Sequence, residues 1–229
     1  MKFNVFILFF LTTSFLFSQK TDEKIFSKKL NEERSFSIIT PASYANNPEK
    51  KYPLLVLLDG EYLTDPFNGI LKYGNYWDDL PEMIIVSINQ NYGETRFRDS
   101  EYGEDGLPAK SGAKFFEFIG FELLPFVQSK YRTLPFRIIA GHDTTGGFLN
   151  FYLYKDDPIF NAFISLSPEI APMMENRITD RLAKIQKPVF YYLATSTADL
   201  EEIQENTKKI PNGMLYLQYP CSLSSGFTF

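Results

Sequence analysis

The sequence predicts an α/β fold, in which a doubly wound, mostly parallel sheet forms a single domain. Apolar runs of strand length alternate with stretches of helical spacing along most of the 229 residues. The runs carry few charges, as expected for parallel strands buried on both faces. They are YPLLVLL (52–58), MIIVSI (83–88), FRIIA (136–140), FNAFISL (160–166) and KPVFYYL (187–193). In such a sheet, ligands bind at the carboxyl ends of the strands.

Other segments complete this alternation. Residues 33–40 alternate like a strand, and residues 214–219 are expected to form the last strand. A long polar loop, residues 89–112, precedes a helix over 113–131, which Pro125 is expected to kink or split. Further helices are expected over residues 144–154, 175–185 and 200–210, and residues 62–80 are expected to form a helix and a loop.

The N-terminus has the pattern of a secretory signal peptide. Lys2 supplies a positive start, residues 3–17 are almost wholly apolar, and Ser18 is a small residue at a cleavage point. The apolar run is shorter than the ~20 residues that a membrane span needs. We therefore expect a signal peptide over 1–18, a loose charged leader over 19–32 and one domain over 33–229, exported to the periplasm or outside the cell, with no integral span after cleavage.

Composition limits the chemistry. The formal net charge is −5 and the pI is about 5.1, without a basic cluster, which argues against nucleic acid as a partner. Cys221 is the only cysteine and His142 the only histidine, so the sequence offers no internal disulfide and no ligand spacing for a metal. We expect no metal and no cofactor. The oligomeric state cannot be read from the sequence.

The stretch FRIIAGHDTTGGFLNF (136–151) joins a buried strand to a helix through a tight turn of small residues. This context is that of a nucleophile elbow, where a strained residue projects at the carboxyl end of the sheet and the next N–H groups point at the same place. The usual form is G-x-S-x-G. Here Asp143 stands at the serine position, and the second glycine falls one residue late.

In their order and spacing, these pieces resemble the putative esterase branch of the α/β-hydrolases, which includes enterochelin-esterase-like and esterase-D-like proteins. The resemblance spans roughly residues 33–168. It is carried by YPLLVLLDGE (52–61), RFRD (96–99), the 115–131 helix with its ELLP (122–125), RIIAGH (137–142) and FNAFISLSP (160–168). The resemblance implies an α/β-hydrolase-type sheet and a Ser-His-Asp/Glu triad that acts on esters, thioesters or lactones.

The same resemblance assigns roles by position. Asp143 takes the place of the nucleophile, and the acid is expected at Asp199 or Glu201, after the 189–193 strand. The histidine is expected beyond Tyr219. The oxyanion N–H groups are expected at Thr144 and at Gly60 or Glu61.

Two departures from this pattern impair the implied chemistry. An aspartate replaces the serine, and the only histidine, His142, lies inside the elbow, where we expect a structural role. The tail CSLSSGFTF (221–229) stands where the histidine loop is expected, so we expect the domain to be incomplete at its C-terminus. Arg96 is a candidate clamp for an anionic substrate, with a solvated salt bridge as the alternative. Trp77 is a candidate cleft residue, with core packing as the alternative.

Three functional hypotheses remain open. The chain is a carboxylic-ester hydrolase by family whose activity is impaired, or a non-catalytic pseudo-esterase that binds a small-molecule ester, a similar ligand or a partner. The third is an Asp-nucleophile hydrolase, because Gly141-His142-Asp143 matches the start of the G-H-D-x-G elbow of haloalkane dehalogenases and epoxide hydrolases. That third chemistry needs a base to activate water, for which those families use a histidine.

Overall fold

A computed structural model describes residues 19–90, 94–185 and 187–210. Its strands form one sheet in the order β1-β2-β4-β3-β5-β6-β7. All pairs from β4 to β7 are parallel, whereas β1 and β2 add an antiparallel edge. The strands are β1 (Gln19–Ser27), β2 (Glu32–Thr40), β3 (Tyr52–Leu57), β4 (Ile84–Ile88), β5 (Thr133–His142), β6 (Ala162–Leu166) and β7 (Phe190–Ala194). The predicted α/β class with a mostly parallel sheet is confirmed.

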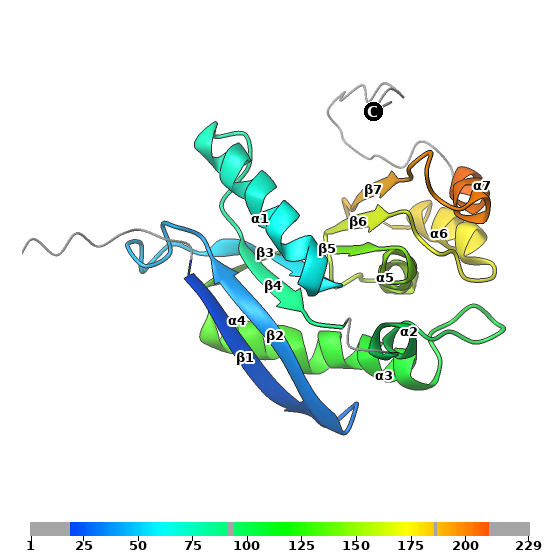
Figure 1. Ribbon diagram of the computed structural model, residues 1–229, viewed down its shortest axis with the longest axis horizontal. Coiled ribbons are helices and arrows are strands. Elements are labelled where there is room, and N and C mark those ends of the chain that lie inside the picture. Colours follow the sequence, from blue (N-terminus) through cyan, green and yellow to red (C-terminus); the bar gives the residue numbers. More distant parts are fainter. Residues whose placement is uncertain (1–18, 91–93, 186, 211–229) are drawn as a thin grey trace, which may run out of the picture.

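Helices cover both faces of this sheet (Figure 1). α1 (Gly60–Tyr76) lies on one face. The other face carries most of the remaining helices, around the larger apolar core. The helical segments after α1 are α2 (Thr95–Asp99), α3 (Lys110–Phe118), the π-helix η1 (Ile119–Leu123), α4 (Leu124–Lys130), α5 (Thr144–Phe148), the 3-10 helix η2 (Leu149–Tyr154), α6 (Met174–Leu182) and α7 (Glu201–Lys209).

The central strands form as predicted because their side chains are apolar on both faces. Every residue of β4 is buried, and β3 is buried except for the partly exposed Pro53. Alternate residues of a strand point to opposite faces, so these runs supply both cores at once. Pro125 is the second residue of α4, and the π-helical turn η1, which ends at Leu123, separates α3 from α4 close to the predicted place.

The segment expected as a loose leader is ordered in the structure from residue 19. It forms β1, antiparallel to β2, with Gln19 opposite Thr40 and Ser27 opposite Glu32. Its alternation is masked by charges on both sides, as is common for a strand at the edge of a sheet. Lys24, for example, forms an ion pair with Glu33 across the two strands at 2.9 Å.

Some predictions lie outside the described residues: the signal peptide over 1–18, the strand over 214–219 and the histidine position beyond Tyr219. Within the residues that the structure does describe, no helix is long and apolar enough to cross a membrane. The same residues contain no group of three or more His, Cys, Asp or Glu side chains that could hold a metal ion.

Candidate active site

The turn after β5 has the geometry of a nucleophile elbow. Asp143 separates β5 from α5 and has φ 55° and ψ −121°, a left-handed region that non-glycine residues seldom adopt. Three backbone hydrogen bonds fix it: its N–H donates to the Leu166 carbonyl at 2.9 Å, and its carbonyl accepts from the N–H groups of Gly147 at 2.9 Å and Glu169 at 3.1 Å. The turn therefore holds Asp143 at the carboxyl end of the sheet, with 37% of its side chain exposed.

Close backbone contacts explain why glycines stand at positions 146 and 147, one residue later than in the usual motif. A Cβ atom at Gly147 would lie 1.9 Å from the Glu169 carbonyl oxygen, and one at Gly146 would lie 2.8 Å from that of Leu166. Thr145, which stands where the usual motif has glycine, is fully buried. Its hydroxyl accepts a hydrogen bond from the His142 N–H at 3.0 Å and donates to Asp59 Oδ2 at 2.6 Å.

A buried ion pair links this turn to the end of β3. Asp59 is fully buried and binds Arg96 of α2 through two hydrogen bonds, Nε to Oδ1 at 2.7 Å and Nη2 to Oδ2 at 3.1 Å. The same guanidinium donates from Nη1 to Asp143 Oδ2 at 3.1 Å and from Nη2 to the His142 carbonyl at 2.7 Å. Arg96 thus holds the carboxylate at the nucleophile position, and only 12% of its side chain is exposed.

This arrangement sets the charge at the site. Burial alone would lower the pKa of Arg96, but the hydrogen bonds and charge of Asp59, with Asp143 behind them, raise it above its usual value. Burial and the neighbouring Asp59 likewise raise the pKa of Tyr62 above its usual value. Arg96 therefore stays cationic and Tyr62 stays neutral.

His142 is oriented away from a base role toward Asp143. Its Nδ1 lies 3.0 Å from the Tyr62 hydroxyl, and that hydroxyl donates its single hydrogen to Asp59 Oδ2 at 2.9 Å. The Tyr62 hydroxyl has one hydrogen, so its bond to Asp59 is compatible with the His142 tautomer that carries the proton on Nδ1. Its side chain is half-buried at the carboxyl end of β5. The structural role expected for His142 stays a prediction.

The two expected oxyanion segments come to the same edge of the sheet. Gly60 begins α1 and Thr144 begins α5, so both present backbone N–H groups that have no partner within their own helix. A Cβ atom at Gly60 would lie 2.1 Å from Ser87 Oγ, which explains the glycine. Glu61 follows as an exposed residue in the first turn of α1. Their oxyanion role stays a prediction.

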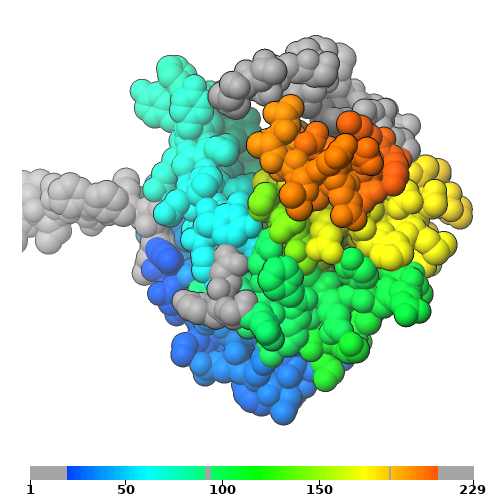
Figure 2. All heavy atoms as spheres, turned by 45° about the vertical axis from the view of Figure 1, so that its right-hand side comes forward, coloured from blue at the N-terminus to red at the C-terminus, as the bar shows by residue number. Residues whose placement is uncertain are grey.

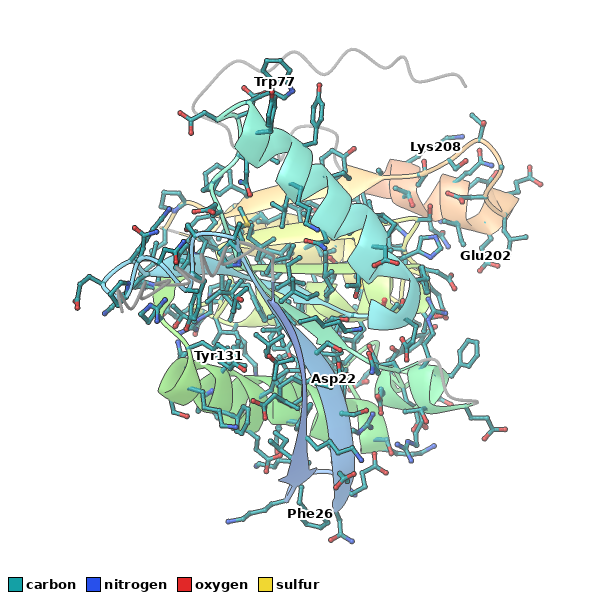
Figure 3. All side chains as sticks on the ribbon, turned by 60° about the vertical axis from the view of Figure 1, so that its left-hand side comes forward. Asp22, Phe26, Trp77, Tyr131, Glu202 and Lys208 are labelled. Atoms are coloured by element: carbon teal, nitrogen blue, oxygen red, sulfur yellow. The ribbon has the colours of Figure 1, made fainter. Side chains whose placement is uncertain are left out.

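Other predicted site residues are placed as follows. Asp199 lies after β7, where its Oδ2 accepts hydrogen bonds from Ser167 Oγ at 2.7 Å and from the Ser196 N–H at 2.6 Å. Glu201 is the exposed first residue of α7. Trp77 follows the last residue of α1 (Figure 3), about 25 Å along the helix from Gly60 at its start, with 60% of its surface exposed. The structure does not bring Trp77 to the elbow.

Sequence reasoning attached no role to Asp59, Tyr62 or Thr145. The available signal was positional, because Asp59 and the elbow both follow strands that are neighbours in a parallel sheet. No motif marks the pairing of Asp59 with Arg96, which lie 37 residues apart.

The model of a protein family described as "Putative esterase" matches residues 27–209. The chain belongs to this esterase family. The expected family and its α/β-hydrolase-type fold are both confirmed by the match and by the sheet.

Similar proteins agree with this membership. Among curated proteins, the esterase-family chain is 26% identical over 160 residues to YjcH of Bacillus subtilis, an alignment that covers 65% of this chain and 61% of YjcH. A crystal structure of a protein from Capnocytophaga ochracea is 28% identical with a TM-score of 0.76, and covers 86% of this chain and 54% of its own. An IroE-like serine hydrolase from Shewanella oneidensis is 25% identical with a TM-score of 0.61, over 76% of this chain and 60% of that one. The chain therefore spans little more than half the length of these relatives.

Proposed function

We propose that this esterase-family chain binds a small-molecule ester or a similar ligand at the elbow and does not catalyse its hydrolysis through Asp143. One observation supports this proposal most strongly. The residue at the nucleophile position is a carboxylate whose Oδ2 is engaged by Arg96 at 3.1 Å, and Arg96 is itself held by the fully buried Asp59. A carboxylate paired with a guanidinium is a weaker nucleophile than a free one, because the ion pair stabilises the ground state.

Esterase chemistry also needs a group that moves protons. The chain has one histidine, and the contact of its Nδ1 with Tyr62 directs that nitrogen toward α1. Asp199, at the expected acid position, receives its hydrogen bonds from Ser167 and Ser196 instead of from an imidazole. Loss of triad members leaves only binding and oxyanion effects, a decrease in rate of ~10⁴ to 10⁶ relative to an intact enzyme.

The ligand class follows from the family and from the site. The Shewanella neighbour is named a serine hydrolase, and another structural neighbour, 18% identical, is named an enterobactin esterase. We infer a small ligand with ester-like or acyl character. The half-exposed carboxylate of Asp143 favours a hydrogen-bond donor or a cationic group of the ligand at the place where a serine would attack. In the same proposal the chain is exported by its signal segment.

A hydrolysis assay with p-nitrophenyl acetate tests this function on the full chain, with Asp143→Ala and Asp143→Ser as variants. We expect the parent chain to hydrolyse the ester no faster than Asp143→Ala does. We expect no large gain for Asp143→Ser, because that change adds a hydroxyl without adding a base. Turnover by the parent chain that disappears in Asp143→Ala would refute the proposal in favour of an Asp-nucleophile hydrolase.

A further inference from the structure

A cavity of about 260 Å³ lies between α1 and the strands β2 and β4. It is found at the opposite end of the sheet from the elbow, because Glu82 and Met83, which precede β4, and Pro41, which follows the antiparallel β2, line it. The elbow lies at the carboxyl ends of the parallel strands, on the side of α2 and α7 that Figure 2 shows. The cavity is therefore separate from the site of the proposed function.

The floor of this cavity is apolar. It is lined by Ile39 of β2, Ile85 of β4 and Leu71 of α1, and the two isoleucines are register partners in the sheet. All three side chains belong to the smaller apolar core on the side of α1, and none is more than 9% exposed. An apolar floor of this kind contacts the hydrocarbon part of a ligand and keeps water away from it.

The rim that α1 contributes is polar, and part of it has no partner. Asn68, Lys72 and Asn75 recur at a spacing of three to four residues, so they lie on one flank of the helix. Asn75 is engaged, since its Nδ2 donates to the Leu80 carbonyl at 2.7 Å. The side chains of Asn68 and Lys72 form no hydrogen bond and no ion pair with any residue that the structure describes. An amide and an ammonium group, one helical turn apart, are thus available to a ligand.

The charge of the cavity is set by Lys72. Among the described residues that line the cavity, Glu82 is the only acid, and its carboxylate is already paired. It accepts hydrogen bonds from Lys50 Nζ at 2.6 Å and from both the hydroxyl and the N–H of Ser43. The uncompensated charge at the rim is therefore the positive charge of Lys72, which selects an anionic group.

We propose that this cavity binds a small monocarboxylate with a short apolar body, such as an unbranched alkanoate. In the bound state Lys72 donates to the carboxylate of the ligand and the amide of Asn68 donates a second hydrogen bond. The alkyl chain then lies on Leu71 and Ile85. Cavities of ~300–1,000 Å³ hold drug-sized molecules, so this smaller cavity fits a ligand of fewer atoms.

Titrations of the full chain with hexanoate, hexan-1-ol and hexylamine test the charge and the apolar body separately. Two-dimensional amide NMR spectra follow each titration and locate the ligand in the same experiment. We expect hexanoate to bind with a Kd of ~1 mM, as suits so few atoms, and to shift the signals of Leu71 and Ile85 instead of those of Thr144 and Gly147 at the elbow. Hexan-1-ol and hexylamine should bind at least about tenfold more weakly, because neither forms the charge-assisted bond to Lys72.

Lys72→Glu reverses the charge of the rim, and Lys114→Glu is the matched control. Both lysines are exposed helical residues without an ion pair in the described part of the chain, and Lys114 lies in α3, which packs on the other face of the sheet. Their replacement leaves the fold intact because neither side chain is buried. Lys72→Glu should weaken hexanoate at least about tenfold and make hexylamine the tighter ligand, whereas Lys114→Glu should change neither affinity.

Equal affinities for hexanoate in Lys72→Glu and Lys114→Glu would overturn the proposal. Hexan-1-ol that binds as tightly as hexanoate would overturn the choice of a carboxylate, and shifts confined to the elbow would show that the cavity is not the site. The absence of any shift well above the expected Kd would overturn the proposal as well. None of these outcomes depends on whether the elbow binds or hydrolyses an ester.

Discussion

The replacement Arg96→Met tests the buried ion pair that organises the elbow. Asp59 accepts four side-chain hydrogen bonds, two from Arg96, one from Tyr62 and one from Thr145, and no part of it reaches solvent. Removal of one partner of a buried pair costs about 3–5 kcal/mol, since the other charge stays buried. Because Tyr62 and Thr145 still donate to Asp59, we expect the lower end, about 3 kcal/mol. For a chain of this size the melting temperature should fall by about 6–12 °C.

The assay is urea unfolding followed by circular dichroism, since Trp77 is too exposed to report on the core by fluorescence. Arg98→Met is the matched control. Arg98 lies two residues away in α2, is 42% exposed and pairs with Glu32 at 2.6 Å, so its loss should cost less than about 1 kcal/mol. The double variant Asp59→Asn/Arg96→Met should lose less unfolding free energy than the sum of the losses in the two single variants. A cost for Arg96→Met no larger than that for Arg98→Met would refute this account of the site.

Two further predictions concern stability. Gly60→Ala should destabilise the protein by about 2–3 kcal/mol, because the added Cβ atom would lie 2.1 Å from Ser87 Oγ. Gly69→Ala, whose added Cβ atom would have no atom within 4 Å, should stabilise the protein by about 0.5–1 kcal/mol in the same urea-unfolding assay. Both changes with the same sign would contradict the packing described at the start of α1. Burial of Glu82 acts to raise its pKa, but hydrogen bonds from Lys50 and Ser43 outweigh burial and lower it. The ionised Glu82 therefore contributes at most about 1 kcal/mol to the stability of the fold. This contribution should be present above pH ~4.5 and lost as the pH falls through the lowered pKa. The difference in unfolding free energy between the parent chain and Glu82→Gln should therefore shrink on acidification. A difference that grows on acidification would contradict the lowered pKa of Glu82.

The sequence predicts the central strands well because burial on both faces leaves continuous apolar runs. It predicts β1 poorly, since an edge strand such as Gln19–Ser27 carries charges that hide its period. α2 was also missed, as a helix of five residues within a polar loop has too few turns to show a period. The position of Asp143 at the elbow could be read from the motif, whereas its partner could not. Arg96 was a candidate for a substrate anion or a solvated salt bridge, and only the fold shows that Asp59 and Asp143 are the carboxylates beside it.

The most direct test of the claim that Asp143 does not attack an ester is a measurement of the first turnover. Stoichiometric p-nitrophenyl acetate is mixed with the full chain, and the release of nitrophenolate is followed in a stopped-flow instrument beside Asp143→Ala. We predict no burst that depends on Asp143, because Arg96 holds the carboxylate and the one histidine of the chain is bound to Tyr62. A burst equal to the protein concentration that disappears in Asp143→Ala would show that the carboxylate attacks the ester, and would contradict the account.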